Sequence, residues 1–557
     1  MDKKTVSAVF LIILVIMAYQ LVILPKVSPP PPPQQTAPAP PPVPQAPPPA
    51  PPPAPLTPAT EKPIAAAPEL PPVSVAADRR DITVEKPLFS TVVDNLRGGL
   101  RSWRLQEYTY GKKVEEAPGE PVEILLPSRD PLALGILFTD SLAESSFSSP
   151  LAVEEDGDGL LLLGADQYGL VMKRRYRFNP ESYDVDLEIT FENRSESPRS
   201  LSWEVFLGPD LYRYRQSGGG PDKPEAIAFV AGELDKVKVK NPGERQTVGA
   251  ATWVGIGDRY FLTALAAQEG GLTGFVRKNA ESGIEVGYRA ETITLVPGQV
   301  ASYRLLGYLG PKEQDRLESY GIGLEKSINY GWFSWLALPF LSILKFFYDY
   351  LQNWGLAILA LTLLVKLALF PITQNMYRSM RKMQSLQPQI QALKKKFKDD
   401  SQGLQRATME LYKEYKVNPM AGCFPMVIQI PVFFALYRVL FNAIELRGAS
   451  FLYIPDLSQK DPYYIAPLLM GATMILQQRM SPTSADPKQA KMMMFMPIIF
   501  TAMFLNFSSG LVLYFLFSNI FAIGEQTLVR KWSSRSATEP AVIREVTPKK
   551  SGKKKKK

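Results

Sequence analysis

The sequence predicts a polytopic α-helical membrane protein with six transmembrane helices, a large all-β domain outside the bilayer and a helical hairpin in the cytoplasm. Three observations lead to this fold class. One apolar run near the N-terminus and five more after residue 350 favour membrane spans. Residues 78–327 alternate apolar and polar side chains in short runs, which is typical of antiparallel strands. Residues 373–418 place apolar side chains at spacings of three and four among many basic ones, which indicates helices outside the membrane.

The chain begins with a predicted membrane anchor, residues 1–25. Its apolar run from residue 6 to residue 24 follows Lys3 and Lys4 and is long enough to span a bilayer. A cleaved signal peptide is the alternative, but the run lacks the small-residue pattern of a cleavage site, which favours an uncleaved anchor. Residues 26–77 are rich in Pro, Ala and Gln, so we predict an extended linker there.

Residues 78–327 are predicted to form a large β-sandwich. Apolar and polar residues alternate at 183–191, 226–230, 236–240 and 284–296, and Gly, Pro, Asn and Asp turn signals separate these runs. A fold of this kind would also suit a sugar-binding or mutarotase-like module. The absence of histidine weakens the enzymatic version of that interpretation.

Residues able to carry catalysis are few. The chain has no His, which removes the usual general base and the commonest zinc ligand. Its one Cys, Cys423, begins an apolar segment and is predicted to be packed rather than reactive. Asp184 with Asp186, and Glu188 with Glu192, would be candidate catalytic pairs, but the solvent face of a strand explains them better. Phosphate-binding and dinucleotide-binding glycine motifs are absent. We therefore expect no enzyme, no metal site and no cofactor.

The membrane portion opens with residues 328–350, in which Trp and Tyr accompany Lys345, Asp349 and Pro339. Aromatic residues of this kind concentrate at the level of the lipid headgroups, so we predict an interfacial amphipathic helix. The apolar segments that follow are the predicted second to sixth transmembrane helices, namely residues 351–372, 419–441, 463–480, 493–508 and 509–529.

Basic residues predict the orientation of these spans. Residues 373–418 hold ten Lys and Arg, and the tail at 530–557 ends in five consecutive Lys, whereas the loop at 442–462 has two basic residues. We therefore predict that both termini, residues 373–418 and the loop at 481–492 are cytoplasmic. The β domain and the loop at 442–462 then lie on the outer side.

Residues 373–418 are predicted to form a coiled-coil hairpin, because two apolar-periodic segments flank a short polar turn. Pro388 is expected to kink the first arm. Lys394, Lys395 and Lys396 give this hairpin a basic face that would suit ribosomal RNA or anionic lipid. Solvated cytoplasmic helices account for most of the same charge.

Polar residues inside the predicted spans are the candidates for a functional site. Lys366 is the one charged residue at 356–370, and a charge at bilayer depth costs roughly 2.5 to 3.5 kcal/mol on insertion scales. Thr362 and Thr373 extend a polar stripe along the same helix. Because Pro371 marks the nearby cytoplasmic end, snorkelling of the Lys366 amine to the headgroups is the alternative. The other spans contribute Gln429, Thr473, Ser518 and Asn519, each of which would also suit an ordinary interhelical contact.

Several long motifs resemble a known family. They are LQPQIQALKKKF at 386–397, NPMAGCFPMVIQ at 418–429, DPYY at 461–464, MSPTSADPKQAKMMMFMP at 480–497 and FSSGLVLYFLFSN at 507–519. These segments resemble the YidC/Oxa/Alb family of bacterial membrane protein insertases, in its Gram-negative form. The resemblance implies a periplasmic β-supersandwich, a periplasmic linker, an inner-membrane location and a five-helix insertase core.

The resemblance also implies an insertase and chaperone for newly made membrane proteins, acting alone or with the Sec translocon and without ATP hydrolysis of its own. Its core helices would form a hydrophilic groove open to cytoplasm and lipid. Lys366 stands where the family commonly has Arg, so the charge is kept while bidentate recognition of a carboxylate is lost. The expected groove residues are Lys366, Thr362, Gln429, Thr473, Ser518 and Asn519. The expected apolar path for the substrate runs along Phe433, Tyr514 and Phe515.

The implied partners are nascent membrane proteins, the Sec translocon, the ribosome through the basic tail and cytoplasmic loops, and anionic lipids. Two other functions stay open on the sequence. A solute or ion transporter would be expected to have inverted repeats, discontinuous helices and paired intramembrane charges, and we identify one intramembrane Lys and no repeat. An envelope-binding protein would carry its function in the β domain and use the helices only as an anchor.

Overall fold

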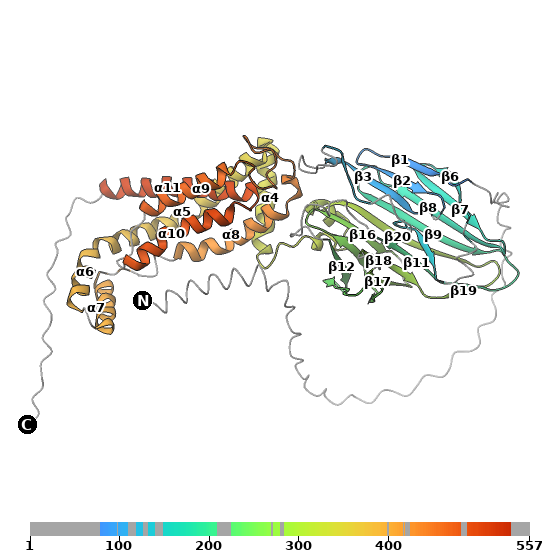
Figure 1. Cartoon of the computed structure of the whole chain (residues 1–557), viewed down its shortest axis with the longest axis horizontal. Coiled ribbons are helices and arrows are strands. Elements are labelled where there is room, and N and C mark those ends of the chain that lie inside the picture. The colour runs from blue at the N-terminus through green and yellow to red at the C-terminus, as the bar shows by residue number, and fades with distance from the viewer. Residues whose placement is uncertain are drawn as a thin grey trace, which may run out of the picture. The chain divides into compact units, whose positions relative to one another are not determined.

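The structure is a computed structural model, and it describes residues 78–535 except 97, 110–118, 126–131, 140–146, 148, 209–223, 269–270, 279–282, 398–399, 416, 418–423 and 481–486. The predicted anchor at 1–25, the linker at 26–77, Cys423 and the tail after residue 535 lie outside the described residues. Within the described residues, a β-rich part is followed by a helical part (Figure 1).

The β-rich part consists of antiparallel sheets. The largest sheet has the spatial order β13 (Glu233–Val237), β12 (Glu225–Val230), β15 (Trp253–Gly257), β16 (Phe261–Ala267), β20 (Val300–Pro311), β9 (Asp184–Asn193), β8 (Leu170–Phe178), β7 (Gly159–Ala165) and β6 (Ala152–Asp156). A second sheet has the order β14 (Arg245–Gly249), β17 (Leu272–Lys278), β18 (Ile284–Ala290), β11 (Trp203–Leu207) and β5 (Ile136–Phe138). A third has the order β1 (Asp81–Glu85), β2 (Phe89–Asp94), β3 (Leu100–Thr109) and β4 (Pro121–Glu123), and β10 (Arg199–Leu201) pairs with β19 (Ile293–Leu295).

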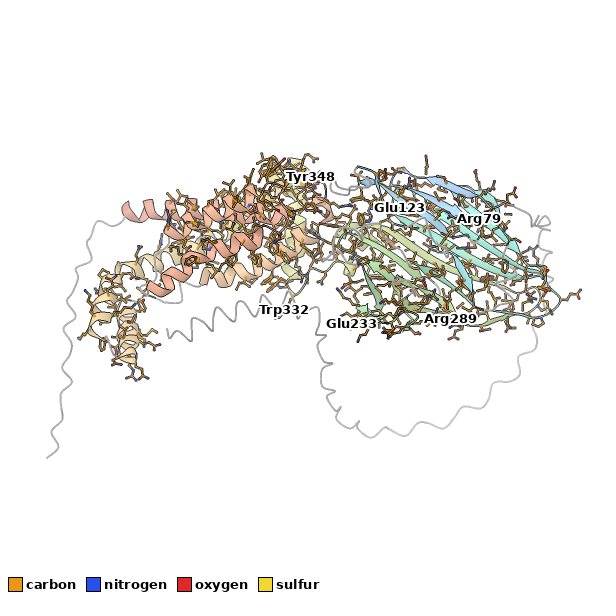
Figure 2. The ribbon with its side chains drawn as sticks, viewed as in Figure 1. Arg79, Glu123, Glu233, Arg289, Trp332 and Tyr348 are labelled. Atoms are coloured by element: carbon orange, nitrogen blue, oxygen red, sulfur yellow. The ribbon has the colours of Figure 1, made fainter. Side chains whose placement is uncertain are left out.

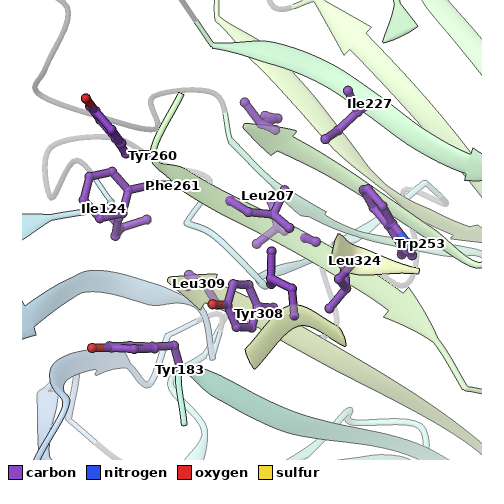
Figure 3. Packing of buried hydrophobic residues seen from close by; sticks show 14 of the residues in the cluster. Ile124, Tyr183, Leu207, Ile227, Trp253, Tyr260, Phe261, Tyr308, Leu309 and Leu324 are labelled. Carbon is purple, nitrogen blue, oxygen red and sulfur yellow. The ribbon is translucent and has the colours of Figure 1, made fainter. Parts of the chain in front are cut away.

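Alternation along the strands builds the core of this part. In β9 every second residue from Val185 to Phe191 is at most 1% exposed, because successive strand residues point to opposite faces. Leu187 pairs with Leu305 of β20, and aromatic residues from other strands fill the interior, as Tyr308 and Trp253 do in Figure 3. The strands predicted at 183–191 and 226–230 are therefore confirmed as β9 and β12. The run at 236–240 ends as a strand at Val237, and the run at 284–296 is two strands, β18 and β19.

Three of the four carboxylates of β9 lie on its solvent face, as the sequence indicates, whereas Asp184 is buried at the start of the strand, contrary to that prediction. Glu188 lies 3.3 Å from Arg175, and Glu192 lies 3.1 Å from Lys173. Asp184 accepts a hydrogen bond of 2.6 Å from the hydroxyl of Tyr320. Over the residues that the structure describes, no group of three His, Cys, Asp or Glu side chains is placed to hold a metal ion.

The helical part follows two short elements, α3 (Gln314–Ser319) and η3 (Leu324–Ser327). Its helices are α4 (Ser334–Leu351), α5 (Trp354–Ser385), α6 (Gln387–Lys396), α7 (Ser401–Glu414), α8 (Phe424–Asn442), α9 (Ile465–Met480), α10 (Pro487–Phe504) and α11 (Ser509–Arg535), with a short turn of 3-10 helix, η5 (Ile444–Leu446), after α8. Helix α11 packs against both α5 and α9, α9 packs against α10, and α4 packs against α5 and α8. Figure 1 shows these helices side by side.

Helix α4 has a buried apolar face and an exposed face with aromatic side chains, and its location at the membrane interface stays a prediction. Helix α4 begins at Ser334, six residues after the predicted start at residue 328. Gly331, with a φ of 72°, forms a turn just before it. Leu344 is fully buried, whereas Trp335 in the first turn is 68% exposed. Trp332, two residues before the helix, is 91% exposed (Figure 2). Exposed Trp of this kind is typical of a surface at the lipid headgroups.

Helix α5 continues well beyond the predicted end of the span at residue 372. It ends at Ser385, and a new helix starts after Leu386, so the first arm of the expected hairpin is divided between two helices. Pro388 lies in the first turn of α6, where a missing N–H is tolerated, so this position is a helix break rather than the expected kink. Helices α6 and α7 share a small apolar cluster of Leu386, Ile390, Leu411 and Val417.

The helix lengths leave the number of spans a prediction. Among the described residues, α5 and residues 509–529 of α11 are long and apolar enough to cross a membrane, and Ile428–Asn442 and Met494–Phe504 are shorter apolar helices. Helix α10 begins at Pro487 and ends at Phe504, which shifts it toward the N-terminus relative to the predicted span at 493–508.

Candidate functional site

Helix α11 presents polar side chains to three neighbouring helices. The first contact joins it to α8, where the Nε2 of Gln429 donates a hydrogen bond of 2.9 Å to the hydroxyl of Tyr514. Tyr514 is 2% exposed, and its hydroxyl also hydrogen-bonds Ser518, one turn further along the helix. The structure therefore brings Gln429, Tyr514 and Ser518 together in one buried cluster.

The second contact joins α11 to α9. The Nδ2 of Asn519 lies 3.3 Å from the hydroxyl oxygen of Thr473, to which it donates a hydrogen bond. The Thr473 hydroxyl itself donates a hydrogen bond of 2.7 Å to the carbonyl oxygen of Met470. Asn519 and Thr473, which lie 46 residues apart in the sequence, are thus neighbours across the two helices.

The third contact joins α11 to α5 and contains a carboxylate. The hydroxyl of Thr373 donates a hydrogen bond to buried Glu525, and the charge of Glu525 interacts with that of Lys366. One residue further, the Nε2 of Gln526 donates a hydrogen bond of 3.3 Å to the hydroxyl of Tyr377. Lys366 and Thr373 are seven residues apart, which is close to two helical turns, so both lie on the side of α5 that meets α11.

Lys366 and Thr362 are placed differently, although they are one turn apart. Lys366 is partly buried, and within the part of the chain that the structure describes its ammonium has no carboxylate oxygen within the 4.0 Å of an ion pair. Thr362 is fully buried, and its hydroxyl donates a hydrogen bond of 2.6 Å to the carbonyl oxygen of Ile358 in the same helix. The described hydrogen bond of Thr362 therefore lies within α5, whereas the electrostatic interaction of Lys366 reaches α11.

The expected apolar path is a cluster of aromatic rings. The ring centroids of Phe433 and Phe515 are 5.4 Å apart, and those of Phe504 and Phe515 are 4.8 Å apart. Phe433 and Phe515 are partly buried, whereas Tyr514 is buried and bonded to Gln429. Phe433 and Phe515 are thus partly accessible, whereas Tyr514 is buried and makes a polar contact with Gln429.

The outer faces of these helices are apolar. Leu367 on α5 is 61% exposed, Leu468 on α9 is 59% exposed, and Ile498 on α10 is 56% exposed. Polar side chains of α5 and α9 face α11 instead. Exposed aliphatic side chains around a polar interior suit helices that lie in hydrocarbon, where lipid covers such surfaces.

Lys394, Lys395 and Lys396 form the last turn of α6. Lys395 and Lys396 are exposed and Lys394 is partly exposed. Helix α6 packs on α7 through Leu386 and Ile390, so its lysines belong to a separate surface and not to the polar contacts of α11.

The sequence analysis missed Glu525, the most prominent polar residue of the α5–α11 contact. It is the one charged residue in the apolar stretch 509–529, and the reasoning that singled out Lys366 applies to it equally. The sequence analysis identified one intramembrane Lys, Lys366, and did not consider the carboxylate of Glu525. Glu525 adds a carboxylate to Lys366 in the predicted spans, so the argument against a transporter from its expected charges is weaker than the sequence analysis made it.

Comparisons with known proteins cover nearly the whole described chain. The family model described as "60Kd inner membrane protein" matches residues 346–536, and the one described as "YidC periplasmic domain" matches residues 81–343. A protein of Syntrophus aciditrophicus (strain SB) named "Membrane protein insertase YidC" is 39% identical over 551 residues, which cover 95% of this chain and 100% of that protein. A protein of Geobacter metallireducens with the same name is 38% identical over 489 residues, covering 85% of this chain and 90% of that protein.

Solved structures give weaker likenesses. A crystal structure of an active YidC insertase with the first transmembrane domain resolved has 20% identity and a TM-score of 0.36, and the match covers 81% of this chain and 93% of that one. A putative aldose 1-epimerase from Escherichia coli K12 has 9% identity and a TM-score of 0.29, with 42% of this chain and 100% of that chain covered.

Proposed function

The chain belongs to the YidC family of membrane protein insertases, and we propose that it inserts newly made proteins into the inner membrane and helps them to fold, with no ATP hydrolysis of its own. It has the β-rich periplasmic domain and the apolar helices of that family. The observation that carries the proposal is the convergence on α11 of polar side chains from α5, α8 and α9, inside a surface of exposed aliphatic residues.

Such an arrangement lowers the main barrier to insertion. A hydrophobic segment with a polar flank enters lipid slowly because the flank must lose its water in hydrocarbon. In the proposed groove, Lys366 attracts acidic residues of the flank, while Gln429 and Asn519 offer hydrogen bonds during the passage. The other polar lining residues are Thr362, Thr473 and Ser518.

Apolar burial then drives the substrate out of the groove. The segment would pass along Phe433 and Phe515 into lipid, with Tyr514 holding Gln429 in place behind them. Each methylene that leaves water contributes roughly 0.8 kcal/mol, so a segment of twenty apolar residues supplies ample free energy without a nucleotide.

The topology and the partners are part of the same proposal. The six spans are proposed from the apolar runs, and the cytoplasmic termini and the cytoplasmic location of α6 and α7 from the distribution of Lys and Arg. Lys394, Lys395 and Lys396 would then contact anionic lipid or the ribosome, and the Lys-rich tail at 530–557 would contact the ribosome. Cooperation with the Sec translocon is proposed from the family.

Photocrosslinking tests the groove. Probes are placed singly at Gln429, Thr473 and Phe515 in the full-length protein, and a ribosome-bound nascent chain with one hydrophobic segment is the substrate. Ile498, whose side chain is 56% exposed on the outer face of α10, is the matched control position. Crosslinks to the nascent chain from the three groove positions, with lipid crosslinks from Ile498, are the expected result. Lipid crosslinks from all four positions would contradict the groove and favour a function in the β domain.

A further inference from the structure

Glu525 occupies a position where a carboxylate is expensive unless another group compensates its charge. Its side chain is buried on α11, in the apolar stretch 509–529. The Thr373 hydroxyl donates one hydrogen bond to it, but a hydroxyl carries no charge. A buried carboxylate in a low-dielectric environment calls for a cation nearby.

Lys366 is the cation that the structure supplies. It lies on the side of α5 that carries Thr373, seven residues and about 10 Å along the helix axis before that residue. The charges of Lys366 and Glu525 interact, yet their atoms are not within the 4.0 Å of an ion pair in the described structure. The two charges therefore interact without a direct ion pair, so a competing carboxylate would not have to break one to reach Lys366.

We propose that Glu525 is the resident counter-ion of Lys366, which an acidic residue in the substrate's flank displaces on entry and which recovers Lys366 when the flank leaves. This inference rests on the proposed insertase function. It makes Glu525 a specificity-determining residue, because the carboxylate limits how strongly the groove holds an acidic flank.

Glu525 would act by competing with the acidic flank for the charge of Lys366. An uncompensated lysine in a partly dry groove would hold an acidic flank tightly, because charges attract strongly where water screens them poorly. A fixed carboxylate nearby repels the flank and offers Lys366 an alternative partner. Glu525 thus weakens the bound intermediate and favours release, which a transit site needs more than tight binding.

Glu525→Gln is the sharpest variant, because the amide keeps the shape and the oxygen that accepts the hydrogen bond from Thr373 but removes the charge. Thr373→Val is the matched control, because it removes the hydrogen bond but keeps the carboxylate. Both variants are compared with the unaltered full-length protein in proteoliposomes. Two single-span substrates are used, identical except for two Asp or two Asn in the translocated flank.

The measured quantities are insertion, by protease protection, and crosslinking of the flank to the groove. We expect Glu525→Gln to raise the crosslinked fraction of the Asp substrate about fivefold and to slow its release, with little change for the Asn substrate. Thr373→Val should affect the two substrates in equal proportion. Equal effects of Glu525→Gln on both substrates, or no effect on either, would overturn the counter-ion role while leaving the insertase function intact.

Exchanging the two charges gives a second test, which remains available if Glu525→Gln fails to fold. Lys366→Glu combined with Glu525→Lys keeps a compensated pair and reverses its polarity. We expect this double variant to bind a flank with two Lys better than one with two Asp, and an unchanged preference for Asp would overturn the proposal. Failure of the unaltered protein to insert any of the substrates would instead refute the proposed function, and the inference with it.

Discussion

The side-chain amide of Gln429 donates a 2.9 Å hydrogen bond to the hydroxyl of Tyr514, and this buried contact joins α8 to α11. The contact orients the two helices and keeps polar atoms at the centre of the helical part. The aromatic rings of Phe433 and Phe515 pack beside it, 5.4 Å apart.

Tyr514→Phe should destabilise the helical part. The substitution removes the hydroxyl and leaves the Gln429 amide without that acceptor, and interhelical hydrogen bonds of this kind contribute about 0.6 kcal/mol, up to about 1.7 kcal/mol. Titration with SDS in mixed micelles measures the free energy of unfolding. The double variant Gln429→Leu with Tyr514→Phe should lose less than the sum of the single losses. Strict additivity would show that the two side chains do not interact.

Lys366→Leu should impair substrates with acidic translocated flanks more than substrates with neutral flanks, because it removes the attracting charge. Lys366→Arg keeps the charge and should be close to neutral. Protease protection in proteoliposomes measures both. Equal losses for the two substrate types would speak against charge attraction, and a severe defect of Lys366→Arg would show that side-chain shape matters more than charge.

Two glycine positions make a matched pair in the helical part. A Cβ at Gly471 of α9 would lie 2.2 Å from the Oγ1 of Thr501 on α10, whereas a Cβ at Gly524 of α11 would meet no atom within 4 Å. Gly471→Ala should therefore push α9 and α10 apart, at a cost of about 1–3 kcal/mol. Gly524→Ala should be neutral or stabilise by up to about 1 kcal/mol, because alanine favours helix. Thermal denaturation in detergent compares them, and an equal shift for both would contradict the packing argument.

The burial of Lys312, which directly follows β20, predicts that the stability of the β-rich part depends on pH in an unusual way. Its ammonium donates hydrogen bonds to the carbonyl oxygens of Asp258, at 2.7 Å, and Ser327, at 3.3 Å, and burial lowers the pKa of Lys312 from 10.5 to about 8. Between these two pH values the unfolded chain binds a proton that the folded chain has lost. The free energy of unfolding should therefore rise with pH across this window, by up to about 3 kcal/mol from this group.

Lys312→Met is the test of that dependence. Tyrosines with raised pKa values lower the free energy of unfolding at the upper end of this pH window. They are present in both the unaltered protein and the variant, so the difference in pH dependence between the two reports on Lys312 alone. Denaturation of the full-length protein in detergent at pH 7.5 and pH 9.5, followed by tryptophan fluorescence, measures it. We expect the rise with pH to be smaller in the variant, and the same pH slope in both proteins would show that Lys312 does not titrate in this range.

Sequence periodicity predicted the β-rich domain well because each strand's burial is a local property. The alternation that places Val185 and Leu187 inside β9 is readable from nine consecutive residues. The ends of the helices were predicted less well. Hydrophobicity indicates where a span leaves the lipid, but a helix continues for as long as its backbone hydrogen bonds do, and those of α5 continue to Ser385. The first arm of the predicted hairpin is therefore divided between the end of α5 and α6, which hydrophobicity alone does not indicate.

The sequence predicted which polar residues belong to the candidate site, but not which of them form hydrogen bonds with each other. Gln429, Thr473, Ser518 and Asn519 were all identified as polar residues in apolar segments. Which of them bond to each other depends on helix rotation, which a single sequence does not specify. Glu525 was missed although it meets the same criterion as Lys366, because it lies near the end of its apolar segment, where charges usually reach water.

The polar contacts of α5, α8 and α9 all terminate on one helix, so their relative placement depends on the register of α11. One residue inserted between Asn519 and Glu525 would rotate everything after it by about 100°. The Tyr514 hydroxyl would still face Gln429, but the Glu525 carboxylate would turn away from α5 and leave Lys366 without its counter-charge. Point substitutions along this segment alter single contacts, whereas a change in its length alters the electrostatic pairing of the whole interior.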